Sequence, residues 1–199
     1  MSDGNIKDGS GSGNLAKVDS NHRLHTFNVN VTEEFEETNA GNAYNLNTGD
    51  ITFSDGTSSG VSYIKNNEDL DLIITGYIYL VGNSTGGSGE DSVLQIIKNP
   101  TAGTLISSPT SVGTPINRNF GSSKTLDVTW NIGESGKTVT DGTVAIESRL
   151  SSPSRFVVSV STVVPKGSSV ALKYTPPPSN TSQKCQFAVA AYLRELGVA

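Results

Sequence analysis

The chain has 199 residues, of which 34% are hydrophobic and 21 are glycine, and its formal net charge is −5. This length suits one all-β domain with an arm, or two small domains, and the many turn residues are typical of all-β proteins. The acidic balance and the lack of a basic run argue against a nucleic-acid-binding groove.

The N-terminal residues 1–22 are predicted to form an extended glycine-rich arm. The glycine and serine run at residues 9–13 cannot hold a packed conformation alone, so order there would require a partner surface. Residues 24–32 alternate between apolar and polar side chains, which predicts a first strand. We therefore expect a single β-sandwich domain over residues 23–199.

The next segments predict short elements separated by turns. The acidic residues 33–37 are expected to be an exposed loop or one helical turn, since their spacing does not match a calcium loop. Residues 44–53 have strand character but contain a turn signal at residues 47–50. A short strand is expected at residues 61–65.

Residues 72–81 are apolar on both faces of a predicted strand. One face would carry Leu72, Ile74, Ile78 and Leu80, and the other Ile73, Tyr77, Tyr79 and Val81. A strand covered on both sides lies centrally in a packed sheet or at a subunit contact.

The middle of the chain contains its longest irregular segment. Residues 92–98 are predicted to form a strand, and the polar, proline-containing residues 101–121 a long loop. Loops of this length in compact domains tend to be functional or to contact partners. Further strands are expected at residues 122–130, with Trp130 in the core, and at residues 143–150.

The C-terminal third predicts a hairpin. Residues 155–164 and 170–175 have strand patterns, and the Pro165 and Gly167 positions suit the turn between them. Residues 184–196 fit a closing strand better than a helix. About nine or ten strands at fairly even spacing predict an antiparallel β-sandwich of the jelly-roll kind.

The sequence offers few groups that could carry out catalysis. Cys185 is the only cysteine, which excludes an intrachain disulfide, and we expect it to be a buried apolar residue. His22 and His25 have no cysteine or carboxylate set to complete a metal site. Glu147 and Asp127 could serve a glycosidase, but both are expected to face solvent on strands. We expect no enzyme activity, cofactor or metal.

Several short segments resemble a group of tailed-bacteriophage virion proteins. Residues 8–24 are similar to their Asp-Gly-Ser/Thr-Gly … Ala-Lys-Val-Asp … Arg-Leu opening, and further matches lie at residues 44–49, 63–68 and 165–169. The resemblance implies a small virion structural protein made in the cytoplasm of the bacterial host. No signal-peptide core or membrane-spanning stretch is present in the sequence.

From this resemblance and the arm we expect a capsid decoration, or cement, protein on the capsid surface. It would clamp neighbouring major capsid subunits non-covalently, and many copies would add up to a stabilised head. Its partners would be the major capsid protein and itself, as a trimer or dimer, without nucleic acid or membrane. The candidate capsid-binding residues are Asp8, Gly9, Gly11, Gly13, Lys17 and Arg23.

Two other functions remain open. A tail, baseplate or fibre component could contact host-surface glycans, and exposed aromatic side chains such as Tyr77 or Tyr79 would favour it. A glycan hydrolase on a jelly roll would depend on Glu147 or Asp127.

Overall fold

A computed structural model describes residues 5–7, 15–18, 24–25, 31–86, 90–151 and 153–194. The chain forms two compact units, Met1–Thr32 and Glu33–Ala199. Among the described residues, no helix has both the length and the apolar character to cross a membrane.

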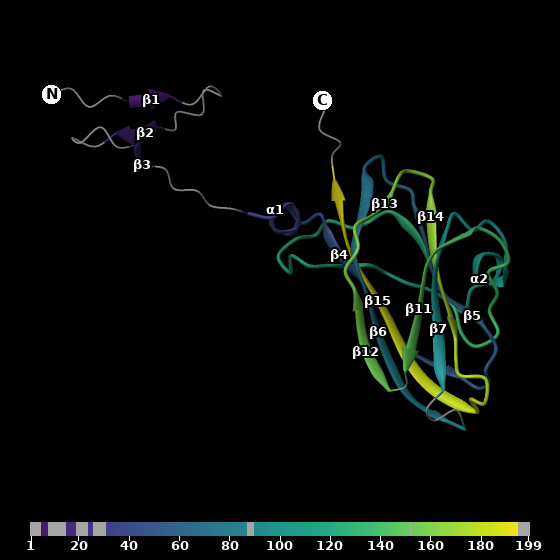
Figure 1. The fold of residues 1–199 in the computed structure, drawn as a ribbon. Coiled ribbons are helices and arrows are strands. Elements are labelled where there is room, and N and C mark those ends of the chain that lie inside the picture. Colours follow the sequence, from purple (N-terminus) through teal and green to yellow (C-terminus); the bar gives the residue numbers. More distant parts are fainter. Residues whose placement is uncertain are drawn as a thin grey trace. The chain divides into compact units, whose positions relative to one another are not determined.

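The first unit contains a small antiparallel sheet (Figure 1). Strand β1 (Asn5–Lys7) pairs with β2 (Leu15–Val18), and β2 pairs with β3 (Leu24–His25). The unit extends past the expected boundary at residues 22 and 23, because β3 joins this sheet and not the sheets of the second unit. A strand was predicted at residues 24–32. Its first two residues form β3, and residues 26–30 lie outside the described residues.

The second unit is built from two antiparallel sheets, which confirms the all-β prediction (Figure 1). Sheet I has the strand order β12-β6-β15-β4-β9, with β13 also paired to β6, and sheet II has the order β11-β7-β14-β5-β10-β8. The strands are β4 (Ala43–Phe53), β5 (Ser59–Asn66), β6 (Asp71–Thr85), β7 (Asp91–Lys98), β8 (Ser111–Val112), β9 (Ile116–Asn117), β10 (Val128–Ile132), β11 (Thr143–Ser151), β12 (Ser154–Val158), β13 (Thr162–Val164), β14 (Ser169–Thr175) and β15 (Ser182–Arg194). Two short helices, α1 (Glu33–Ala40) and α2 (Thr104–Ser107), complete the described elements.

The longer strands pair in a nested order. Strand β4 pairs with β15, β5 with β14, β6 with β12, and β7 with β11, so the earliest strand meets the latest one. The connection between β7 and β11, residues 99–142, carries α2, β8, β9 and β10. We call this connection the insertion.

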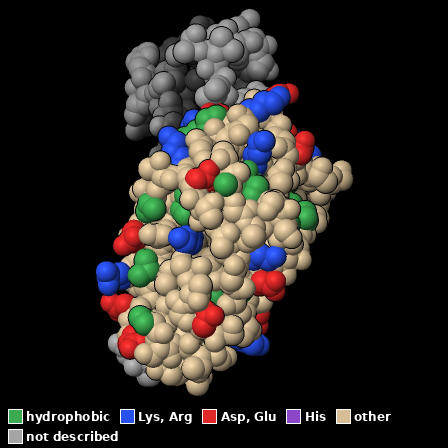
Figure 2. Space-filling view, turned by 90° about the vertical axis from the view of Figure 1, so that its right-hand side faces the viewer, with side chains coloured by type: hydrophobic (Ala, Val, Ile, Leu, Met, Phe, Trp, Pro, Cys, Tyr) green, Lys and Arg blue, Asp and Glu red, His purple; other side chains and the backbone are tan. Residues whose placement is uncertain are grey.

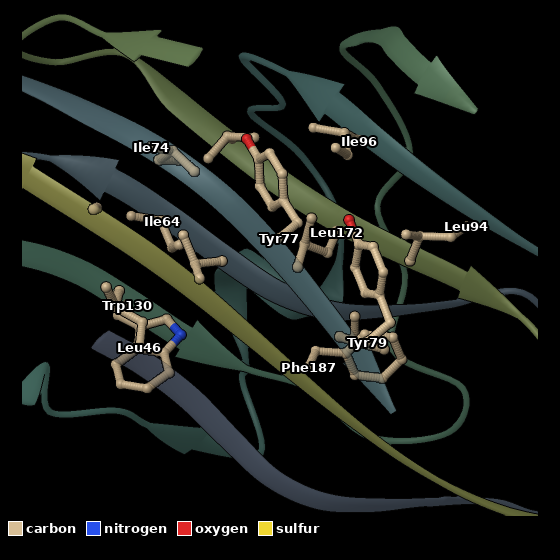
Figure 3. Packing of buried hydrophobic residues seen from close by; sticks show 14 of the residues in the cluster. Leu46, Ile64, Ile74, Tyr77, Tyr79, Leu94, Ile96, Trp130, Leu172 and Phe187 are labelled. Atoms are coloured by element: carbon tan, nitrogen blue, oxygen red, sulfur yellow. The ribbon is translucent and has the colours of Figure 1, made fainter. Parts of the chain in front are cut away.

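The inner faces of both sheets share one hydrophobic core (Figure 3). Phe187 of β15 is fully buried, and its ring centroid lies 5.4 Å from that of Tyr174, 6.0 Å from that of Tyr79 and 6.4 Å from that of Phe53. Trp130, 2% exposed, confirms its predicted core position and donates its Nε1 hydrogen bond to Ser62 Oγ at 3.1 Å. Aromatic side chains from both sheets therefore fill the space between them.

Cys185 is a buried residue of β15, as predicted from the sequence. Only 2% of it is exposed, and burial raises the pKa of its thiol to about 11. A thiol with such a pKa is almost wholly protonated at neutral pH, so this cysteine is a poor nucleophile.

Strand β6 is central, as predicted, but the prediction of its two faces was wrong. Leu72 and Ile74 face the core together with Tyr77, Tyr79 and Val81. The pairing with β15 shifts between Ala190 and Ala191, which leaves an extra residue in β6 before Gly76. Since a shift of one residue exchanges the faces of a strand, the inward set changes parity there.

The predicted turn at residues 47–50 is instead an irregularity within the continuous strand β4. Thr48 and Gly49 lie opposite the single residue Phe187, because Asn47 pairs with Ala188 and Asp50 with Gln186. Gly49 has a φ of 71°, and the Thr48 hydroxyl contacts the backbone of Phe187 at 3.1 Å. The Asn-Thr-Gly signal therefore marks a β-bulge.

The predicted hairpin over residues 155–175 was wrong, although its turn is present. Ser168 N donates to Pro165 O at 3.0 Å, and Gly167 has a φ of 78°. Strand β13 pairs with β6 in sheet I, whereas β14 pairs with β5 and β7 in sheet II. The turn connects the two sheets, and the strand expected at residues 155–164 is divided into β12 and β13.

Two further strand predictions, at residues 184–196 and 122–130, agree at least in part with the structure. The closing strand predicted at residues 184–196 is confirmed by β15, although residues 195 and 196 lie outside the described residues. The strand expected at residues 122–130 is shorter and later, since β10 covers Val128–Ile132.

Candidate interaction surface

Both ends of the insertion are fixed by one carboxylate. Asp141 accepts hydrogen bonds from the Thr101 hydroxyl and from the backbone amides of Thr101 and Ala102, at 2.8 and 2.9 Å for the two amides. These hydrogen bonds hold the pKa of the Asp141 carboxyl below its ordinary value. The insertion is therefore a closed loop whose two ends lie together.

Helix α2 attaches the insertion to the outer face of sheet II. Leu105 is fully buried and packs in a small cluster with Tyr63, Ile97, Val139 and Ala171. This cluster explains why Ala171, on the outward face of β14, is buried. The first half of the insertion is thus a packed cover.

The following segment, residues 111–121, which we call the apolar loop, lies along the edge of β10. Thr110 N donates to Ile132 O at 3.0 Å, and Gly113 N donates to Trp130 O at 2.9 Å. A Cβ on Gly113 would lie 2.2 Å from Cε3 of Trp130. The loop backbone is therefore in direct contact with the indole ring, and only glycine fits at this position.

Helix α1 holds the other end of the apolar loop. Arg118 forms an ion pair with Glu34, and its backbone N donates to Ala43 O at 2.8 Å. Asn119 Nδ2 donates to Asn39 O, the backbone carbonyl of a residue in α1, at 2.9 Å. Of the two alternatives for residues 33–37, the structure has the helix, and Glu34 fixes it to the insertion.

The apolar loop exposes three large hydrophobic side chains. Val112 is 71% exposed, Ile116 is 62% exposed and Phe120 is 95% exposed. Single exposed apolar residues are common on proteins, and these three are a candidate interaction site because they share one anchored segment. The residues between them are held by backbone hydrogen bonds, so these side chains are presented on a fixed backbone.

No charge of one sign dominates the described part of the face shown in Figure 2. Figure 2 shows a mostly polar face on which acidic and basic side chains of both signs are scattered among isolated hydrophobic ones. Within the described part of this face, no large region of one sign stands out. A partner that binds this face would therefore be recognised by its shape and by apolar contacts more than by a strong electrostatic field.

The candidate arm residues are mostly not among those that the structure describes. Asp8, Gly9, Gly11, Gly13 and Arg23 lie outside the described residues, while Lys17 belongs to β2, where it pairs with Asn5 and His25. The described surface site, by contrast, comes from the insertion. The sequence indicated this site only through the length of the loop predicted at residues 101–121. Because most residues of that loop are polar, its three exposed apolar residues were not predicted as contacts.

The two carboxylates weighed for glycoside hydrolysis do not come together. Glu147 lies on β11 and accepts a hydrogen bond from Gln95 Nε2 at 2.7 Å, whereas Asp127 directly precedes β10. Strands β7, β14 and β5 lie between β11 and β10, which separates them by roughly 19 Å at the usual strand spacing. Paired glycosidase carboxylates lie within about 10 Å of each other.

Two other kinds of site considered from the sequence are a glycan-binding tip with exposed tyrosines and a metal site. Tyr77 and Tyr79 are fully buried, so neither is the exposed aromatic residue that a glycan-binding tip would need. Across the described residues, no three His, Cys, Asp or Glu side chains gather in a group that could hold a metal ion.

No protein-family model matches the chain, and no curated protein was found to be similar to it. Its family therefore has to be argued from the residues and the fold.

The contact between the apolar loop and Trp130 gives a testable prediction. Gly113→Ala should lower the free energy of unfolding by about 2 kcal/mol, because the new methyl group overlaps the indole ring and the loop must move. Gly121→Ala, in the same loop, meets nothing closer than 3.5 Å and should change it by less than about 0.5 kcal/mol. Urea denaturation of both variants measures this, and equal midpoints would contradict the close packing.

Proposed function

We propose that the chain is a bacteriophage virion structural protein, a capsid decoration protein that clamps neighbouring major capsid subunits on the head surface. The observation that carries the proposal is the anchored apolar loop with Val112, Ile116 and Phe120 exposed. The short segments that resemble tailed-bacteriophage virion proteins indicate the class of protein, a virion structural protein. The two together favour a protein whose work is contact with other chains.

The second unit would be a jelly roll that serves as a rigid platform. Jelly rolls contain eight strands arranged as two Greek keys. The nested pairing of β4 with β15, β5 with β14, β6 with β12 and β7 with β11 agrees with this arrangement, with the insertion between its fourth and fifth strands. On such a platform, exposed side chains of the insertion such as Phe120 could change without disturbing the core, whereas Trp130 of β10 belongs to the core.

Binding would combine two contacts. The apolar loop would bury its exposed side chains against one capsid subunit, and the arm, with Asp8, Gly9, Gly11, Gly13, Lys17 and Arg23, would order on a neighbouring subunit. Two linked contacts raise the apparent affinity well above that of either alone, since the second becomes intramolecular. A second copy of the chain could add a third contact in a dimer or trimer.

The experiment is an occupancy measurement on heads of the phage that encodes the chain, prepared without this protein. Full-length protein should bind in hundreds of copies per particle, whereas a chain lacking residues 1–20 and the full chain carrying Ile116→Ser and Phe120→Ser should each leave heads nearly empty. Val144→Ser, at a 48% exposed position on β11, is the matched control and should bind normally.

The outcomes separate the parts of the proposal. If the truncated chain still fills its sites, the arm is not a capsid contact. If the loop variant binds like the control, the apolar loop is not one either. Binding confined to tails, with at most a few dozen copies, would instead favour the tail, baseplate or fibre alternative.

A further inference from the structure

A cavity of about 370 Å³ opens between the two sheets where β13 faces β7, β11 and β14. Its volume lies within the range of small-molecule sites in proteins, about 300 to 1,000 Å³. The cavity is far from the apolar loop in the strand order, because it lies at the β11 edge of sheet II and the loop at the β8 edge. It therefore calls for an explanation of its own.

The inner wall of the cavity is the hydrophobic core itself. Ile96, Val164 and Val170 line it and belong to the buried core cluster, and the half-buried Ile146 packs against that cluster. A space bounded by such side chains favours an alkyl group over water. The ligand should therefore have an aliphatic part.

The mouth of the cavity carries a cation. Lys98 ends β7 and lines the cavity, and by strand alternation it lies on the same face as Leu94 and Ile96. No Asp or Glu occurs among the described residues that line the cavity, and no described ion pair involves Lys98. A ligand with an anionic end would meet this ammonium group.

A buried hydroxyl lies behind the same wall. The Tyr77 hydroxyl is fully buried and has no hydrogen-bond partner of good geometry among the described residues. The side chain that interacts with it is that of Thr162, which lines the cavity. In Figure 3 the hydroxyls of Tyr77 and Tyr79 point toward the side of the core where Ile96 and Leu94 lie. A buried hydroxyl without a partner is uncommon. It marks this part of the core as a place where a further group could be accommodated.

We propose that this cavity binds a medium-chain alkyl carboxylate, with its chain between the sheets and its carboxylate at Lys98. The apolar wall recognises the chain, and the single cation at the mouth recognises the head group. The inference stands apart from the proposed virion function, because it uses none of the residues of the apolar loop or the arm.

The test is calorimetric titration of the full chain with decanoate. We expect one site per chain, with octanoate binding about tenfold more weakly, because two fewer methylene groups are buried. Lys98→Met should weaken decanoate binding about tenfold by removing the charged partner. Lys173→Met, an equal charge change on β14 with the outward-facing parity of Ala171, is the control and should bind like the original protein.

Two further measurements separate the cavity from general surface binding. Ala145→Trp, at an exposed position that lines the cavity, should fill the cavity and abolish binding while the urea midpoint stays unchanged. Decylammonium should bind at least tenfold more weakly than decanoate. Equal binding of the two amphiphiles, no heat with decanoate, or unchanged affinity in both Lys98→Met and Ala145→Trp would each overturn the proposal.

Discussion

Phe187→Ala should lower the free energy of unfolding by about 3 to 5 kcal/mol, the largest effect that we expect from a single substitution. Phe187 is fully buried on β15, between β4 and β6, and its ring contacts those of Tyr174, Tyr79 and Phe53. Truncation removes buried apolar area and leaves a cavity that the three strands carrying the neighbouring rings, β4, β6 and β14, cannot collapse. Since domains of this size are stable by about 5 to 15 kcal/mol, the variant should be only marginally folded.

The single tryptophan makes this measurement direct. Trp130 is buried in the same core, so its fluorescence should report unfolding in urea. Phe120→Ala is the matched control, because Phe120 is 95% exposed and its truncation should change stability by less than about 0.5 kcal/mol. If the two variants unfold at the same urea concentration, the assignment of Phe187 to the core is wrong.

The strands that sequence analysis located correctly are those with a clear apolar period. Strand β14 keeps Val170, Leu172 and Tyr174 on the core face over its full length, and β15 keeps Cys185, Phe187 and Val189 there. In these strands, side-chain alternation and burial agree, so a local pattern is enough.

The errors arose where local chemistry is shared by two structures. An Asn-Thr-Gly sequence suits a hairpin turn and a bulge alike, because both need a glycine with positive φ. The turn at Pro165 has the same local geometry whether its flanking strands pair with each other or enter different sheets. Only long-range pairing, such as β13 with β6 and β14 with β5, distinguishes the two, and the sequence does not show it.

The candidate interaction surface was only partly predictable for a related reason. Loop length indicated residues 101–121, but no period marks which apolar residues of a loop stay exposed. Leu105 and Phe120 are both large and apolar. Leu105, in α2, is nevertheless fully buried against the outer face of sheet II, whereas Phe120 is almost wholly exposed to solvent. Their difference depends on Asp141, Gly113 and α1, which hold the insertion from three separate places in the chain.

Asn66→Ala should cost about 3 kcal/mol of unfolding free energy, because one buried side chain holds the turns that connect the two sheets. Asn66 is fully buried, and its Nδ2 donates to Leu70 O at 2.8 Å and to Val164 O at 2.9 Å. Its Oδ1 accepts from Glu68 N at 3.0 Å. Alanine would leave three backbone groups without these partners, each at a cost of about 1 kcal/mol or more.

The neighbouring asparagine supplies the control for this prediction. Asn67 Nδ2 makes only longer, exposed hydrogen bonds, at 3.2 Å to Asp127 Oδ1 and 3.3 Å to Thr129 Oγ1, so Asn67→Ala should cost less than about 1 kcal/mol. Urea denaturation of the two variants compares the same chemical change at adjacent positions. A smaller loss for Asn66→Ala than for Asn67→Ala would mean that the crossing from β13 to β14 does not depend on this amide. The expected order would instead show that the crossing between sheets is fixed by Asn66 from the end of β5, a residue far from the turn in sequence.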